Sequence, residues 1–340
     1  MSETRYKSSL RDYMHSYLQY KRNMGYRFTK EEFTLRKIDS FLVNIHFSQS
    51  YISEDTYQRW WKTTEGLSDK TRYYDAVVFR GFLKYMASLG IDCHIPRLPG
   101  RRDSDYVPYI FSEEELKGIF EASDRLRIKE RATKSVLISI PAIIRLLYST
   151  AIRVSEAVNL KLGDIDFAHH LIRLDYTKNG HQRIAPINDS LESVLRQYVS
   201  YRNRLPYTHL REPDSHLFVS SQGTPITRAY VLRYFYQILE DVGIEHKGNH
   251  VGPHIHSLRH SACVHAMVKL AKCGKPVYSS LPILSAFMGH RKVLDTEKYL
   301  RLTQEMYPDL MELDQAVTGS IKDIIEQACK SYGTYNENQG

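Results

Sequence analysis

The chain has 340 residues, of which 42% are hydrophobic and 25% charged, and this composition is typical of a soluble globular protein with up to two domains. Its net charge of +8 favours a polyanionic partner such as nucleic acid. The start, MSETRYKSSL, lacks the layout of a signal peptide, the longest apolar run, VLISIPAII, is too short to cross a bilayer, and no glycine-rich phosphate loop is present. The four cysteines form no CxxC pair, so we expect a cytoplasmic protein without structural zinc or disulfides.

Residues 7–91 are predicted to form four helices with short connections, which is typical of a small helical bundle. The first follows KSSLRDYMHSYLQYKRNMG, and the second begins at Thr29. Ser53 and Ser68 precede the third and fourth helices, and the fourth ends at Gly90. The expected inner face of the second helix consists of Phe33, Ile38, Phe41 and Leu42.

The stretch HIPRLPGRRDSDYVP is rich in proline, glycine and charge, and it is predicted to be a linker. Beyond it, Ser112 and Glu115 form a capping-box pattern, and an apolar helix is expected around 134–149. The segments LIRLDYT and QRIAPI flank KNGH, which predicts a hairpin with Asn-Gly at its turn. Further helices are predicted at 189–204, 227–242 and 257–272.

The predicted fold class is therefore mainly α with a small antiparallel β-sheet in the second domain. The tail TGSIKDIIEQACKSY has isoleucines along one face, which predicts a short amphipathic helix that packs on its own domain or on a neighbouring subunit. The expected divisions are a helical domain at 1–95, a linker at 96–108, a second domain at 109–315, and a helix and tail at 316–340.

Residues 254–265, HIHSLRHSACVH, contain four histidines and one arginine. A zinc site is disfavoured, because no acidic residue lies between Glu245 and Asp295 to complete a ligand set with His256 and His260. A helix start with satisfied structural histidines is an open alternative. Arg259 between these histidines instead suggests a site for an anion, since all of these side chains donate hydrogen bonds when protonated.

A second guanidinium is offered by LLYSTAIRVSEAVNL, where Arg153 follows an apolar helix and Glu156 lies three residues on. The alternative is an ordinary surface arginine, although its neighbours Ala151, Ile152 and Val154 are apolar. Arginine binds phosphate through a planar fork of N–H groups. Two such forks with one or two imidazoles could stabilise the charge of a phosphoryl-transfer transition state without a metal.

These motifs occur in the order and spacing of the tyrosine recombinases, the phage integrase family, which this chain resembles over residues 109–315. The motifs are Arg153 in STAIRVSE, His256-Ser-Leu-Arg259-His260, Gly289-His290, Tyr299 in DTEKYL, and Lys178 in YTKNGH at the position of the family's turn lysine. The N-terminal bundle and linker resemble the family's core-binding domain more weakly. The segment AKCGKPVYSSLPILSAFMGH is longer than in simpler integrases and is similar to that of recombinases carried by mobile elements.

The resemblance implies a site-specific recombinase in which Tyr299 attacks the scissile phosphate, forming a 3′-phosphotyrosyl link and freeing a 5′-hydroxyl. Covalent catalysis conserves the bond energy, so no ATP is required. The resemblance also implies that no metal and no other cofactor takes part. Arg153 and Arg259 would clamp the non-bridging oxygens of the phosphate.

The resemblance also implies roles for three other side chains. His256 would be the base or proton relay for the tyrosine hydroxyl, and His290 would donate to a phosphate oxygen. Lys178 would protonate the 5′ leaving oxygen, with a solvated turn lysine as the alternative. The remaining histidines of the cluster are expected to support the site (His254 and His260) or to be structural (His265).

Two domains and a basic linker would clamp a duplex DNA recombination site, and strand exchange between two duplexes implies a homotetramer on DNA. The candidate DNA-binding residues, for each of which a solvated basic face is the alternative, are Lys70, Arg72, Arg101, Arg102, Arg228 and Arg233. A second recombinase or an accessory DNA-bending protein is an additional candidate partner. A membrane partner is not expected, because no basic amphipathic helix with an apolar Trp/Leu face stands out.

The predicted function is integration or excision of a mobile element by an enzyme associated with the nucleoid. A type IB topoisomerase, which uses similar chemistry without site preference, is the first alternative. A non-catalytic DNA-binding relative is the second, and a metal-dependent hydrolase is disfavoured by the lack of carboxylates in the cluster.

Overall fold

The computed structural model describes residues 6–100, 107–129, 136–175, 182–246, 252–290 and 292–307. The chain divides into two compact units, Met1–Tyr106 and Val107–Gly340, and the boundary falls within the predicted linker. Three candidate site residues, Arg101, Arg102 and Lys178, lie outside the described residues, as does the predicted helix and tail at 316–340. Among the helices that are described, none has the length and apolar character that a membrane span requires.

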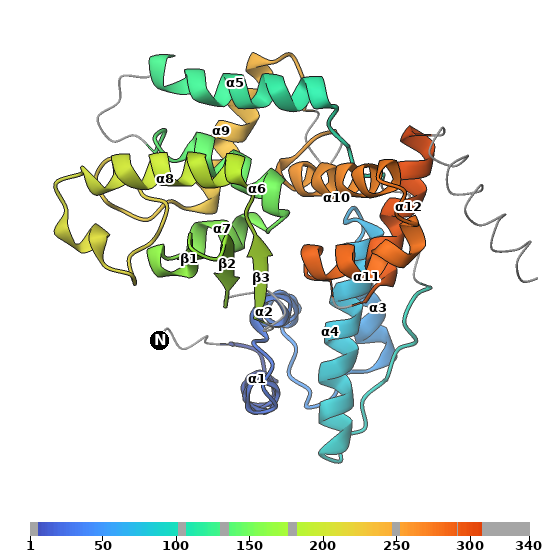
Figure 1. Ribbon diagram of the computed structural model, residues 1–340. Helices are drawn as coiled ribbons and strands as arrows, with labels where there is room; N and C mark the ends of the chain where they lie inside the picture. The colour runs from blue at the N-terminus through green and yellow to red at the C-terminus, as the bar shows by residue number, and fades with distance from the viewer. Residues whose placement is uncertain are drawn as a thin grey trace, which may run out of the picture. The chain divides into compact units, whose positions relative to one another are not determined.

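Four helices make up the described part of the N-terminal unit, as the apolar spacing predicts. They are α1 (Arg11–Asn23), α2 (Thr29–Asn44), α3 (Glu54–Thr63) and α4 (Asp69–Ser88), coloured blue to cyan in Figure 1. Ser53 and Ser68 cap α3 and α4, because their side chains accept hydrogen bonds from the backbone N–H groups of Thr56 and Thr71.

The inner face of α2 differs from the prediction at one position. Leu35, Ile38 and Leu42 are fully buried, because residues three and four apart lie on one face of a helix. Phe33 lies off this face and is 60% exposed, so its assignment to the inner face was wrong. The ammonium group of Lys37, one turn on, lies 5.3 Å from the centre of the Phe33 ring and covers part of it.

The second unit is mainly helical with a small antiparallel sheet, which confirms the predicted fold class. The sheet has the order β1 (Ile165–Asp166), β2 (Leu171–Leu174), β3 (Arg183–Pro186), and Leu174 pairs with Arg183 beside the predicted hairpin turn. Two short 3₁₀ helices are η1 (Leu162–Asp164) and η2 (Thr208–Arg211). The α-helices are α5 (Glu113–Lys129), α6 (Ile140–Thr150), α7 (Val154–Asn159), α8 (Asp189–Asn203), α9 (Arg228–Asp241), α10 (Ile255–Lys272), α11 (Val277–Met288) and α12 (Leu294–Met306).

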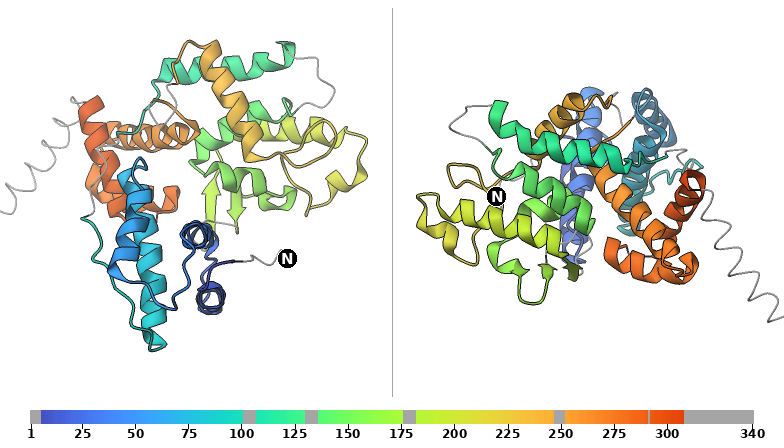
Figure 2. Two further views of the ribbon diagram at one scale, coloured as in Figure 1. Left: turned by 180° about the vertical axis from the view of Figure 1, so that it is seen from behind. Right: turned by 45° about the horizontal axis from the view of Figure 1, so that its top comes forward.

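The core of this unit places the ends of several helices close together. The apolar helix α6 packs between α5, α8, α9 and α10, and its residues Ile143 and Leu146 are fully buried. It ends at Thr150, and the next residue, Ala151, has a φ of 51° that turns the chain toward Arg153. A second apolar cluster joins α10, α11 and α12, which lie side by side in Figure 2. Tyr299 belongs to this cluster. Burial of apolar surface therefore fixes the helix that carries Tyr299 against the helix that carries Arg259.

Candidate active site

Arg259 is a buried guanidinium held by the ends of two helices. It lies on the second turn of α10 and is only 4% exposed. Its two terminal nitrogens donate to the backbone carbonyls of Ala151, after α6, and Met288, at the end of α11. Guanidinium has five N–H groups, so these two bonds fix its plane and leave further donors for an anion.

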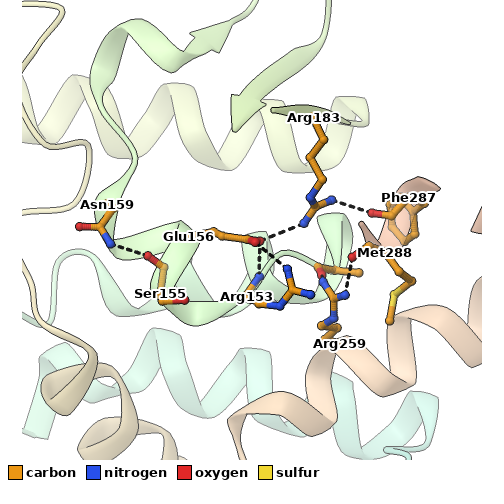
Figure 3. Close-up of polar contacts among 9 residues, drawn as sticks. Arg153, Ser155, Glu156, Asn159, Arg183, Arg259, Phe287 and Met288 are labelled. Carbon is orange, nitrogen blue, oxygen red and sulfur yellow. Dashed lines mark hydrogen bonds and ion pairs between the residues drawn. The ribbon is translucent and has the colours of Figure 1, made fainter. Parts of the chain in front are cut away.

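Glu156 binds two further guanidiniums, those of Arg153 and Arg183, as Figure 3 shows. Arg153 is the N-cap of α7, and its backbone N–H and its guanidinium each donate to one carboxylate oxygen of Glu156 at 2.8 Å. Arg183, on β3, donates to the same carboxylate at 2.9 Å and to the carbonyl of Phe287 at 2.7 Å. This network joins α7, the sheet and the end of α11. Arg183 was not predicted from the sequence as a site residue.

The carboxyl of Glu156 is ionised despite its burial. Burial alone would raise its pKa, but the backbone N–H of Arg153 and the charges of Arg183 and Arg153 outweigh it and lower the pKa below the ordinary value. Glu156 therefore carries a negative charge, which forms ion pairs with both Arg153 and Arg183.

Replacing Glu156 with glutamine should lower the free energy of unfolding by about 3 kcal/mol, because two partly buried guanidiniums lose their counter-charge. Urea unfolding monitored by circular dichroism would measure this change. Glu192→Gln is the matched control, since the two partners of Glu192 are exposed, and it should change stability little. Equal effects of the two substitutions would contradict this account of the Glu156 network.

Gly289 allows the close approach of Arg183. Its φ is +63°, which L side chains rarely adopt, and an added Cβ would lie 2.5 Å from Nε of Arg183. Gly274 has a similar φ of +70° but nothing within 4 Å of an added Cβ. We therefore expect Gly289→Ala to destabilise the protein by about 2 kcal/mol more than Gly274→Ala, with the difference due to the clash with Arg183. Thermal unfolding of both variants would measure this difference, and equal losses would show that Arg183 moves aside without cost.

Tyr299 places its hydroxyl among histidines. It comes from α12, is 6% exposed, and its hydroxyl oxygen lies 2.6 Å from Nδ1 of His260. The ring of His290 stacks on the tyrosine ring with centres 6.1 Å apart and an angle of 12° between planes. Nδ1 of His290 lies 2.8 Å from Oγ1 of Thr296, which orients the imidazole. The ring of His256 is centred 6.0 Å from that of His260.

His256, His260 and His290 are neutral at pH 7. Burial, and next to it the charges of nearby arginines and histidines, lowers the pKa of His256 and of His290 to about 4 and that of His260 to about 3. Burial, followed by the charge of Arg153, lowers the pKa of Arg259 to about 10, so it remains a cation. Among the described residues, no carboxylate forms an ion pair with Arg259, since Glu156 pairs with Arg153 and Arg183. The buried positive charge of Arg259 therefore suits this cluster to binding an anion.

Acid should destabilise this unit before its carboxylates titrate. Each of these histidines has a folded-state pKa below its unfolded value of about 6.5. The stability they contribute is therefore fully present above pH 6.5 and is lost as the pH falls toward 4. We expect the free energy of unfolding to fall by at least about 2 kcal/mol between pH 6.5 and 5. Urea titrations at both pH values would show it; His256→Asn should reduce the fall, and a flat profile would contradict it.

Five of the predicted catalytic residues belong to one cluster, in which electrostatic interactions and ring contacts link its members. The charge of Arg153 acts on His256, Arg259 and His290 and lowers the pKa of each. These five residues are Arg153, His256, Arg259, His290 and Tyr299. Sequence reasoning missed Arg183 and the direct contact of His260 with the tyrosine.

The predicted DNA-binding residues are more dispersed. Arg228, at the exposed start of α9, is close enough to His256 to lower its pKa, and Arg233 is exposed on the same helix. In the N-terminal unit, Lys70 is exposed. Arg72 is half-buried, donates to Oγ1 of Thr64 at 3.1 Å and stacks over the ring of Trp61 at 4.3 Å. Within the described residues, no three His, Cys, Asp or Glu side chains are grouped so as to hold a metal ion.

Comparison with known proteins places these residues in a family. The model of the phage integrase family matches residues 110–306. The chain is 25% identical over 306 residues to y4rB of Sinorhizobium fredii, to which an integrase or recombinase role is assigned, covering 89% of this chain and 96% of that protein. It is 29% identical over 201 residues to the tyrosine recombinase XerC of Staphylococcus saprophyticus, covering 59% of each chain.

Two solved structures share the fold. The recombinase XerH, bound to a palindromic difH substrate in a post-cleavage complex, has a TM-score of 0.64 at 20% identity, covering 89% of this chain and 83% of that one. The Tn1549 transposon integrase, in complex with transposon right end DNA, has a TM-score of 0.60 at 17% identity, covering 84% of this chain and 94% of that one.

Proposed function

Because the chain belongs to the phage integrase family and is a tyrosine-type site-specific recombinase, we propose that it integrates or excises a mobile element. The nearly full-length similarity to an assigned integrase or recombinase supports this element-borne role, as does the fold shared with a transposon integrase. The proposed substrate is a duplex recombination site at the ends of the element, and the protein would act on the nucleoid in the cytoplasm.

One observation carries the proposal: the hydroxyl of Tyr299 lies within a cluster of arginines and neutral histidines that suits a phosphate anion. Tyr299 is the nucleophile that forms the 3′-phosphotyrosyl link. Arg259, fixed by two carbonyls, and Arg153, fixed by Glu156, donate to the non-bridging oxygens as negative charge develops on them.

Three further side chains complete the proposed site. His290 donates to a phosphate oxygen from Nε2, because its other ring nitrogen, Nδ1, is engaged with Thr296. His256 binds the phosphate or relays a proton beside it. Lys178, next to β2 and β3 in sequence, protonates the leaving 5′ oxygen.

DNA binding is proposed to depend on basic residues of both units. The net charge of +8 provides attraction to phosphates that weakens with salt. Arg228 and Arg233 would reach DNA from α9, Lys70 and Arg72 from α4, and Arg101 and Arg102 from the linker. Exchange between two duplexes requires four cleavages, so the proposed active assembly is a tetramer.

Covalent trapping tests the function. Purified protein is incubated with nicked duplexes from the flanks of its gene in the presence of a chelator, and covalent adducts are resolved on denaturing gels. The nick releases a short 5′-hydroxyl fragment, so the adduct accumulates. Adducts at one defined sequence are expected. Adducts at scattered sequences would favour a type IB topoisomerase, and tight binding without any adduct would favour a non-catalytic relative.

A further inference from the structure

The imidazole at hydrogen-bond distance from the hydroxyl of Tyr299 is that of His260. The oxygen and Nδ1 lie 2.6 Å apart, which is a short distance for a neutral pair. His256 lies one helical turn earlier on α10, and Nδ1 of His290 is engaged with Thr296. The sequence alone assigned His260 to a supporting role, because the pattern of the motif does not show which histidine faces α12.

We propose that His260 accepts the proton of Tyr299 when the tyrosine attacks DNA and returns it when the strand is rejoined; this proposal rests on the proposed role of Tyr299 as nucleophile. His260 would then be a catalytic residue in its own right, since it touches the reacting atom.

The step balances as follows. The proton of the Tyr299 hydroxyl passes to Nδ1 of His260, and an oxygen lone pair of the tyrosine forms the new bond to phosphorus. The bond from phosphorus to the 5′ oxygen breaks, its electron pair stays on that oxygen, and the oxygen takes a proton from Lys178. In rejoining, an incoming 5′-hydroxyl gives its proton to Lys178 and attacks phosphorus. The bond to the tyrosine oxygen breaks, and that oxygen recovers its proton from His260.

The surroundings of His260 suit this role. Proton acceptance requires a neutral imidazole, in the tautomer that carries its hydrogen on Nε2, and burial keeps His260 neutral at pH 7. The charged and titratable groups that face it are His254 at the N-cap of α10, His256 and Arg259 on α10, His290 after α11, and Tyr299 on α12. A bound phosphate would offset the positive charge of Arg259, and this makes His260 a stronger base when substrate is present.

The position of His260 is also fixed independently of DNA. It follows Arg259 directly in α10, and the guanidinium of Arg259 is anchored to carbonyls after α6 and at the end of α11. Proton transfer needs donor and acceptor at hydrogen-bond distance, and here both sit on packed helices. This assignment leaves His256 to contact the phosphate.

The test uses the full chain and a nicked duplex on which the wild type forms its adduct. His260→Asn and His260→Gln should lower the single-turnover cleavage rate at pH 7 by about 10²- to 10³-fold, with DNA binding unchanged. Their rates should rise by about tenfold per pH unit toward the pKa of the phenol, because solvent then removes the proton. His265→Gln, on the same helix but bonded to Tyr148, is the control and should cleave at the wild-type rate.

A second readout separates proton transfer from a structural role. Replacing Tyr299 by a fluorotyrosine of lower pKa makes a base less necessary, so the deficit of the His260 variants should shrink to within about tenfold. The deficit of His256→Asn should not shrink. The proposal is overturned if the His260 variants cleave at the wild-type rate, if fluorotyrosine leaves their deficit unchanged, or if it rescues His256→Asn instead. Absence of a wild-type adduct on every duplex would overturn the proposed function itself, and this inference with it.

Discussion

Replacement of Tyr299 by phenylalanine is expected to abolish the covalent protein–DNA adduct, with a cleavage rate at least about 10⁴-fold below that of the wild type. Phenylalanine keeps the ring that packs against α10 and stacks on His290, and it removes only the hydroxyl that would bond to phosphorus. The free energy of unfolding should change by less than about 1.5 kcal/mol, the usual value of one hydrogen bond. Denaturing gels on a nicked duplex measure the adduct, and a gel-shift assay measures DNA binding, which should be retained.

Tyr278→Phe is the control for this substitution. Tyr278 lies on the neighbouring helix α11 and is 59% exposed, so loss of its hydroxyl should leave the adduct at the wild-type level. An adduct that persists in Tyr299→Phe would mean that another of the 25 tyrosines is the nucleophile. Peptide mapping of the labelled adduct would then identify it.

The elements of the fold could be predicted where local signals are strong. Apolar spacing and serine caps predict α1 to α4, and an Asn-Gly pair between apolar segments predicts β2 and β3, because each signal acts within a few residues. The exposure of Phe33 could not be predicted as easily. A large apolar residue near the start of α2 fits an inner face in sequence, and only the packing of Leu35, Ile38 and Leu42 shows which face that is.

The site was predictable to the extent that its residues lie in contiguous motifs. Arg153 with Glu156, and His256 with Arg259, are neighbours on one helix or at its start, so their spacing already implies contact. Arg183 could not be found in this way. It lies on β3 and contacts Glu156 on α7 and Phe287 on α11, and both of these residues are far from it in sequence. The contact of His260 with Tyr299 also joins residues of different helices, α10 and α12.

The second large effect is expected at Arg259. Arg259→Lys keeps a positive charge but loses the planar fork that bonds two carbonyls and can still donate to a phosphate. Since the charge of the transition state develops on the non-bridging oxygens, we expect the cleavage rate of folded protein to fall by about 10²- to 10³-fold. Single-turnover cleavage at saturating DNA would measure this, so that weaker binding does not contribute.

Arg202 provides the control that separates catalysis from structure, because it is another buried arginine held by carbonyls. It is fully buried, and it donates to the carbonyl oxygens of Leu217 at 2.9 Å and His216 at 2.6 Å. Arg202→Lys should therefore lower stability, since buried carbonyls lose their donors, but it should leave the cleavage rate of folded protein unchanged. If both substitutions lowered cleavage equally, or if Arg259→Lys affected only stability, Arg259 would be a structural arginine rather than part of the phosphate site.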